Sequence, residues 1–218
     1  MRLDKKFLAR LLDIPEDIIG DIKGKTFELT TTPDDAPETF EGWLNKRFKT
    51  KLEGLQLELQ RQDDLGAIVR AHIHIEHELN DFIYFAAPSP AHVKSMELDF
   101  SKTVRLALVL GLNPNLQSPL NAAGKLRNDF AHRLDMKLGE ERMKTLAKTL
   151  APEAKQQFDA LFKSSLTAAP SESKLPPEGK LYFRTRLQLI AFFFQLFRDV
   201  ARERHRLAFE KLQTIAWH

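Results

Sequence analysis

Three polar side chains, Arg127, Asn128 and His132, lie within six residues of one another and have the chemistry to act together on an anionic group. An imidazole takes or gives a proton near neutral pH, and a guanidinium binds anionic oxygens through paired hydrogen bonds. In a helix Asn128 and His132 are neighbours, because they are four residues apart. Arg127 is offset from His132 by about 140°, but its long side chain can bend around the small Ala131 to reach the imidazole.

A helix is required to hold these three residues in that arrangement. Ser118 and Pro119 are typical of a helix start, and the apolar residues that follow recur at helical spacing. The apolar stripe consists of Ala123, Leu126, Phe130 and Leu134. Polar residues, including Lys125, fall on the opposite side. The segment 119–134 is therefore predicted to be a helix with one buried face and one polar face.

A second helix, over about residues 61–86, contains the segment HIHIEHE, whose members fall on different faces. His72 lies near the centre of the apolar face, where it is interpreted as a hydrogen-bonded core histidine, and Glu76 lies on the flank, one turn later. The outward side carries the remaining members: His74, His77 and Glu78. His74 and His77 are one turn apart but lack an evident third ligand, so no metal site is predicted.

Residues 126–132, LRNDFAH, resemble the Arg-x4–6-His motif of HEPN domains, which usually has a polar residue after the arginine. Two further helices are similar to helices of the same superfamily. Residues 68–83 (IVRAHIHIEHELNDFI) look like its long, polar-flecked helix, and the segment with Phe100, Lys102 and LALVLGL looks like its middle helix. The arrangement is most similar to the mannitol-operon repressor-like branch, and the resemblance covers about residues 60–165.

This resemblance implies an up-and-down helical bundle and metal-independent cleavage of RNA by a homodimer in which two Arg/His pairs meet at one phosphate. It assigns Arg127 to the phosphate, His132 to acid–base catalysis and Asn128 to orienting them; no metal and no cofactor is expected. Three further residues are candidates for supporting roles: Glu76, His72 and Asp129. The role of Glu76 is inferred from the residues rather than from the motif, and requires its helix to pack beside that of His132.

Structural roles also explain the same residues. Arg127 can instead form an ion pair with Glu76 or Asp129 that ties two helices together. His132 can be a histidine at a helix C-terminus, where the macrodipole favours positive charge. The mannitol-repressor-like relatives are regulators, so the resemblance also allows a non-catalytic protein that binds a transcription factor or an antitoxin.

The C-terminal part of the chain is basic. From Lys174 onward nine Lys or Arg oppose four Asp or Glu, a net charge of +5, whereas the preceding residues sum to −2. A basic helix suits a nucleic-acid backbone. The candidate residues for such binding are Arg198, Arg202, Arg204 and Arg206. The alternative is a solvated helix face. In the same helix, residues 190–197 (IAFFFQLF) are apolar nearly all round, which predicts burial on several sides.

Composition limits the remaining possibilities. The 43% hydrophobic and 29% charged residues exclude a wholly disordered chain. The absence of Cys excludes disulfide scaffolds, zinc–thiolate sites, iron–sulfur clusters and thiol nucleophiles. No run approaches the roughly 20 apolar residues that span a bilayer, so a cytoplasmic location without a membrane partner is expected.

The 218 residues suit one large domain or a domain with an appendage. The helical spacing and only nine Gly predict an all-α chain. The predicted organisation is an N-terminal extension (1–40), an HEPN-like bundle (41–165), a flexible linker (166–179) and a long C-terminal helix (180–218) that packs on the bundle or on a partner subunit.

Overall fold

The computed structural model describes residues 6, 9–10, 40–133, 136, 138–167 and 175–216, and every regular element within these residues is helical. The prediction of an all-α chain with a long C-terminal helix is therefore confirmed. The predicted N-terminal extension lies almost entirely outside the described residues, as do residues 168–174 of the predicted linker.

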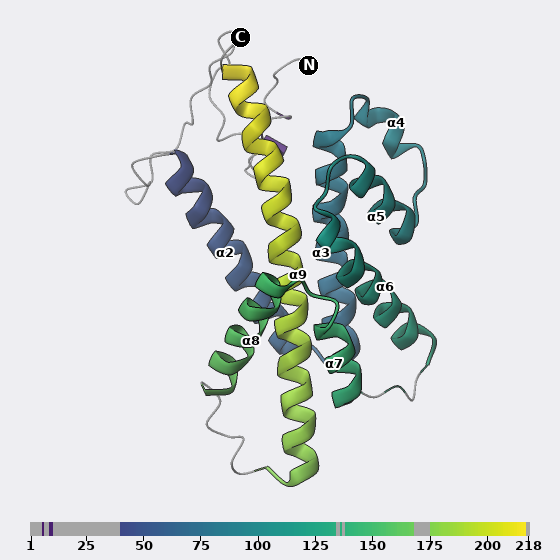
Figure 1. Ribbon diagram of the computed structural model, residues 1–218, viewed down its shortest axis with the longest axis vertical. Helices are drawn as coiled ribbons and strands as arrows, with labels where there is room; N and C mark the ends of the chain where they lie inside the picture. Colours follow the sequence, from purple (N-terminus) through teal and green to yellow (C-terminus); the bar gives the residue numbers. More distant parts are fainter. Residues whose placement is uncertain are drawn as a thin grey trace. The chain divides into compact units, whose positions relative to one another are not determined.

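The helices follow one another along the chain with short connections (Figure 1). They are α2 (Phe40–Arg61), α3 (Asp64–Ala86), α4 (Pro90–Lys94), α5 (Phe100–Val109), the 3-10 turn η2 (Pro114–Leu116), α6 (Gln117–His132), α7 (Glu140–Ala147), α8 (Pro152–Thr167) and α9 (Pro177–Ala216). None of the described helices combines the length and apolar character that crossing a membrane requires.

Short polar side chains define where the helices begin. The Asp63 carboxylate accepts a hydrogen bond from the backbone N–H of Gly66 at 2.6 Å and caps α3. Asp99 caps α5 in the same way, by accepting from the Lys102 N–H at 2.9 Å. Beyond α5, Gly111 has a φ of +99°, which residues with a Cβ rarely adopt.

The chain divides into two compact units, one formed by Leu52–Arg204 and the other by Met1–Lys51 with His205–His218. In the second unit, the ring of Phe48 on α2 lies 5.1 Å from that of His205 on α9. The first unit contains most of the described helices, including all those that carry the residues considered below.

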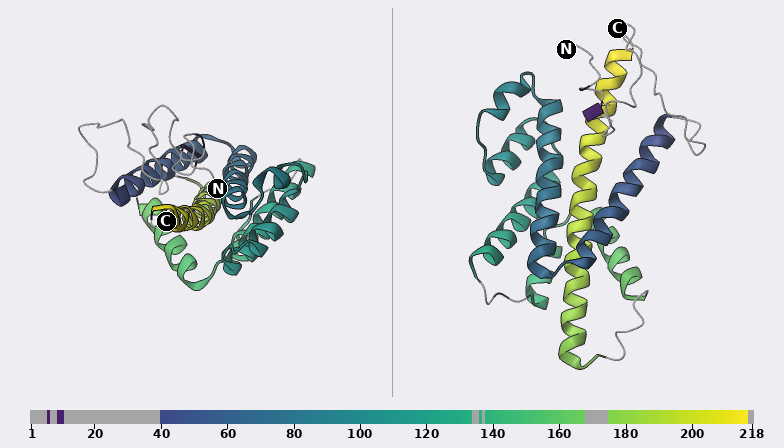
Figure 2. Two further views of the ribbon diagram at one scale, coloured as in Figure 1. Left: turned by 90° about the horizontal axis from the view of Figure 1, so that it is seen from above. Right: turned by 180° about the vertical axis from the view of Figure 1, so that it is seen from behind.

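Helix α3 is the centre of the first unit. Helices α5 and α6 pack on one side of it, and α9 lies on the other side (Figures 1 and 2). Ile68, Ile75 and Leu79 of α3 are fully buried. From α9, every residue of 190–197 is buried, as its apolar character predicted.

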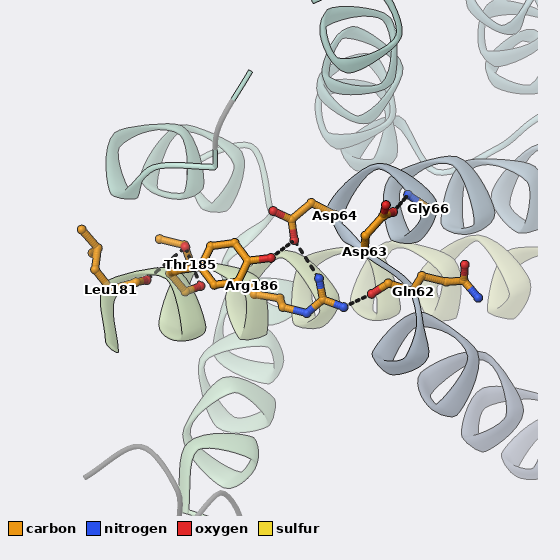
Figure 3. Close-up of polar contacts among 8 residues, drawn as sticks. Gln62, Asp63, Asp64, Gly66, Leu181, Thr185 and Arg186 are labelled. Atoms are coloured by element: carbon orange, nitrogen blue, oxygen red, sulfur yellow. Dashed lines mark hydrogen bonds and ion pairs between the residues drawn. The ribbon is translucent and has the colours of Figure 1, made fainter. Parts of the chain in front are cut away.

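Polar contacts fasten the start of α9 to the turn between α2 and α3 (Figure 3). Arg186 donates through Nη1 to Asp64 Oδ1 at 2.8 Å and through Nη2 to the carbonyl of Gln62. The Tyr182 hydroxyl donates to the same Asp64 oxygen at 3.1 Å. These contacts join segments more than 110 residues apart in sequence.

Candidate functional site

Helix α6 has the two faces that its sequence predicted. Leu120, Ala123, Leu126 and Phe130 are buried, whereas Arg127, Asn128 and His132 are exposed. The helix ends at His132, and Leu134 of the predicted stripe lies outside the described residues. The apolar stripe thus fixes α6 on α3 and α5 and turns the three candidate residues toward solvent.

Arg127 does not form the interhelical ion pair that was its structural alternative. Its Nη1 donates to Oδ1 of the neighbouring Asn128 at 3.0 Å. Asp129 instead pairs with Arg142 of α7 at 3.1 Å. Glu76 is half-buried on α3, and within the described part of the chain neither Glu76 nor any other carboxylate pairs with Arg127.

Arg127 and His132 point to different surroundings within one chain. His132 is exposed in the last turn of α6, and no hydrogen bond or ion pair joins it to Arg127 among the described residues. The bend around Ala131 that would bring the two side chains together is therefore not formed. A site that uses both groups has to bring them together in another way.

Arg127 lines a cavity of about 550 Å³ between α3, the start of α5 and α6. The lining residues are His72, Asp99, Phe100, Ser101, Asn121, Gly124, Lys125, Arg127, Asn128 and Asp129. A Cβ atom at position 124 would lie 2.9 Å from Cδ1 of Phe100, so glycine is what lets α6 approach that ring so closely. The cavity thus brings together residues from three helices, Arg127 and Asn128 among them.

His72 is the buried member of this cavity lining. Its side chain is only 5% exposed, and its ring centre lies 4.2 Å from that of Phe100. Burial first, and then the positive charge of Arg127, lower the pKa of His72 to about 4, so its imidazole is neutral at pH 7. The prediction of a hydrogen-bonded core histidine needs correction, because Nδ1 is buried with no hydrogen-bond partner among the described residues.

No family model, curated protein or solved structure matches this chain. The resemblance to HEPN domains therefore stays a prediction from the sequence, carried by residues 126–132 and by the two helices that precede them.

The outward side assigned to HIHIEHE also needs correction. Glu78 is 1% exposed and accepts a hydrogen bond from Nε of Arg204 at 2.7 Å. His74 is half-buried, with Nε2 3.0 Å from Glu58. Only His77 is fully outward, with Nδ1 3.5 Å from the Asp81 carboxylate. The reason is that α9 covers a second side of α3. Among the described residues no group of three or more His, Cys, Asp or Glu is placed to hold a metal.

The four C-terminal arginines do not form one basic surface. Arg204 is 1% exposed, which corrects its assignment as a nucleic-acid-binding residue. Arg198 is half-buried and donates to Gln195 Oε1 at 2.6 Å and to the side chain of Gln157. Arg202 is exposed, and Arg206, in the second unit, is exposed and pairs with Glu210.

Sequence reasoning missed the cavity and the relation of His72 to Arg127. The two residues lie on different helices, and their proximity depends on how α3 and α6 pack. The close approach of Gly124 to Phe100 is equally non-local. No spacing within a single helix signals either feature.

Proposed function

We propose that this chain binds RNA on the exposed face of α6 and cleaves it without a metal ion, as an HEPN-like ribonuclease that acts as a homodimer. The observation that supports the proposal most is the availability of Arg127. Arg142, Arg186 and Arg204 each face a carboxylate within 3.1 Å. Arg127, in contrast, is exposed and bonded only to the neutral amide of Asn128 among the described residues.

The chemistry follows from the two exposed groups of α6. The 2′-hydroxyl of RNA attacks the adjacent phosphorus while the bond from phosphorus to the 5′-oxygen breaks. A neutral His132 takes the proton of the 2′-hydroxyl, and a protonated imidazole returns one to the leaving 5′-oxygen. The guanidinium of Arg127 binds the phosphate and stabilises the negative charge that develops on it. The products are a 2′,3′-cyclic phosphate and a 5′-hydroxyl.

Two copies of the chain supply both groups to one phosphate in this proposal. Arg127 and His132 of a single chain are not in contact, so a twofold arrangement of α6 helices is required. The exposure of both residues leaves this face of α6 open to a second copy. Asn128 holds the guanidinium of Arg127, and the Asp129–Arg142 pair fixes the end of α6 against α7. Helices α3, α5 and α6 are, in this proposal, the HEPN-like part of the fold.

The experiment is an RNA-cleavage assay in EDTA that compares the wild-type chain with His132→Ala and Arg127→Ala. Both variants are expected to lose at least 100-fold in cleavage rate. The matched controls are His92→Ala and Arg105→Ala, exposed residues on α4 and α5 that do not line the cavity, and they are expected to cleave like wild type. Cleavage that requires added metal, or that persists in His132→Ala, would reject the mechanism.

A non-catalytic regulator is the competing function, since the resemblance also includes regulatory relatives. Its signature is a protein partner that stays bound through purification while RNA is left intact. Nucleic-acid binding through the C-terminal arginines is less well supported, because Arg204 is buried and Arg198 is half-buried against glutamines.

A further inference from the structure

We propose that the cavity between α3, α5 and α6 accepts an unpaired nucleobase of the bound RNA, and that His72 is the residue that recognises it. This inference rests on the proposed RNA function, which it deepens by giving the site a sequence preference. It starts from a polar atom that the fold buries without a partner, Nδ1 of His72.

The cavity has a charged mouth and a neutral interior. Arg127 and Lys125 are exposed on α6, whereas His72 is buried on α3, and all three line the same space. The proximity of Arg127 to His72 is also evident in the pKa of His72, which the Arg127 charge lowers. A strand that places a phosphate on Arg127 therefore presents an adjacent base to the opening of the cavity.

The lining matches what an unstacked base requires. A neutral imidazole offers one donor and one acceptor, and the amides of Asn121 and Asn128 offer both kinds of group. The ring of Phe100 supplies an apolar surface beside His72. Proteins that read single-stranded RNA use this combination of aromatic surface and hydrogen bonds to base edges. The volume of about 550 Å³ falls within the roughly 300–1,000 Å³ of small-molecule sites.

The carboxylates at the cavity do not oppose an RNA strand. Asp99 accepts from the N-terminus of α5 and pairs with Lys102 at 3.1 Å. Asp129 pairs with Arg142 at 3.1 Å. Both negative charges are thus compensated by neighbouring cations, whereas those of Arg127 and Lys125 have no carboxylate partner among the described residues.

The test measures binding by fluorescence anisotropy of five labelled RNA tetramers: the four homopolymers and an abasic tetramer with the same phosphates. The catalytic His132→Ala background prevents cleavage during the measurement. Within it, His72→Leu is compared with His77→Leu, the same change on the same helix at an outward position. Asn121→Ala, at an exposed position of the cavity lining, is a second probe that does not alter the core.

At least one homopolymer is expected to bind tenfold or more tightly than the abasic tetramer. His72→Leu is expected to reduce that preference to within twofold while leaving affinity for the abasic tetramer unchanged, and Asn121→Ala to reduce it at least threefold. His77→Leu is expected to keep the full preference. Equal binding of all five tetramers, or a preference that survives both His72→Leu and Asn121→Ala, would overturn the base pocket alone. Absence of binding by every tetramer would overturn RNA binding itself, and the pocket with it.

Discussion

Arg204 of α9 donates from Nε to Oε2 of Glu78 of α3 at 2.7 Å, and both side chains are only 1% exposed. Removal of one partner leaves a buried charge uncompensated, which costs about 3–5 kcal/mol. We expect Arg204→Ala to lower the free energy of unfolding by about that amount in chemical denaturation. Arg206→Ala removes an exposed pair with Glu210 and is expected to cost less than about 1 kcal/mol. Equal losses in the two variants would contradict the structural role of the buried pair.

His72 makes stability depend on pH. Its pKa is about 4 in the folded chain against 6.5 for the model group, so between these values the unfolded state binds more protons. The free energy of unfolding therefore falls as pH is lowered through this window, by up to about 3 kcal/mol. We expect His72→Leu to lose less stability than wild type between pH 7 and pH 4.5 in urea denaturation. Parallel pH profiles for the two proteins would show that His72 titrates normally.

The charge of Arg127 contributes to the pKa of His72 as well as lining the cavity. Its removal in Arg127→Gln relieves part of the repulsion against protonated His72, so the pKa of His72 should rise. Burial, the larger cause, remains and keeps that pKa below 6.5. An NMR titration of the histidine side chains measures the shift, with Arg105→Gln as the control. A His72 pKa that is the same in wild type and Arg127→Gln would separate the two residues.

Gly124 is required for the contact between α6 and Phe100. A Cβ at position 124 would lie 2.9 Å from the ring, and forcing extra atoms into a packed contact costs about 1–3 kcal/mol. We expect Gly124→Ala to be less stable than wild type. Gly54→Ala is the matched change in α2, where a new Cβ meets nothing within 4 Å, and should stabilise by about 0.5–1 kcal/mol. Thermal denaturation compares them, and a stabilised Gly124→Ala would argue against the close approach.

Local periodicity predicted those parts of the fold that depend on one helix at a time. The stripe of Leu126 and Phe130 is buried, and the predicted C-terminal helix is present as Pro177–Ala216. The same reasoning was wrong for Glu78, because it assumed that α3 has a single buried side. The partner of Glu78 is 126 residues away in sequence, and nothing in the pattern of α3 indicates it.

The candidate site could be predicted only in part for the same reason. The exposure of Arg127, Asn128 and His132 follows from helical geometry. The cavity does not, because it depends on the packing of His72, Phe100 and Gly124 from three helices. Whether Arg127 would face a carboxylate was also open in the sequence, since it depends on which helix Asp129 and Glu76 face.

The most direct test of the central claim is single-turnover cleavage, in EDTA, of an RNA strand and of the DNA strand of the same sequence. The account predicts that RNA is cut to products with 2′,3′-cyclic phosphate ends and that DNA, which lacks the attacking 2′-hydroxyl, stays intact. It also predicts that Arg127→Ala combined with His132→Ala slows RNA cleavage at least 100-fold. Cleavage of the DNA strand, or an undiminished rate in the double variant, would contradict it.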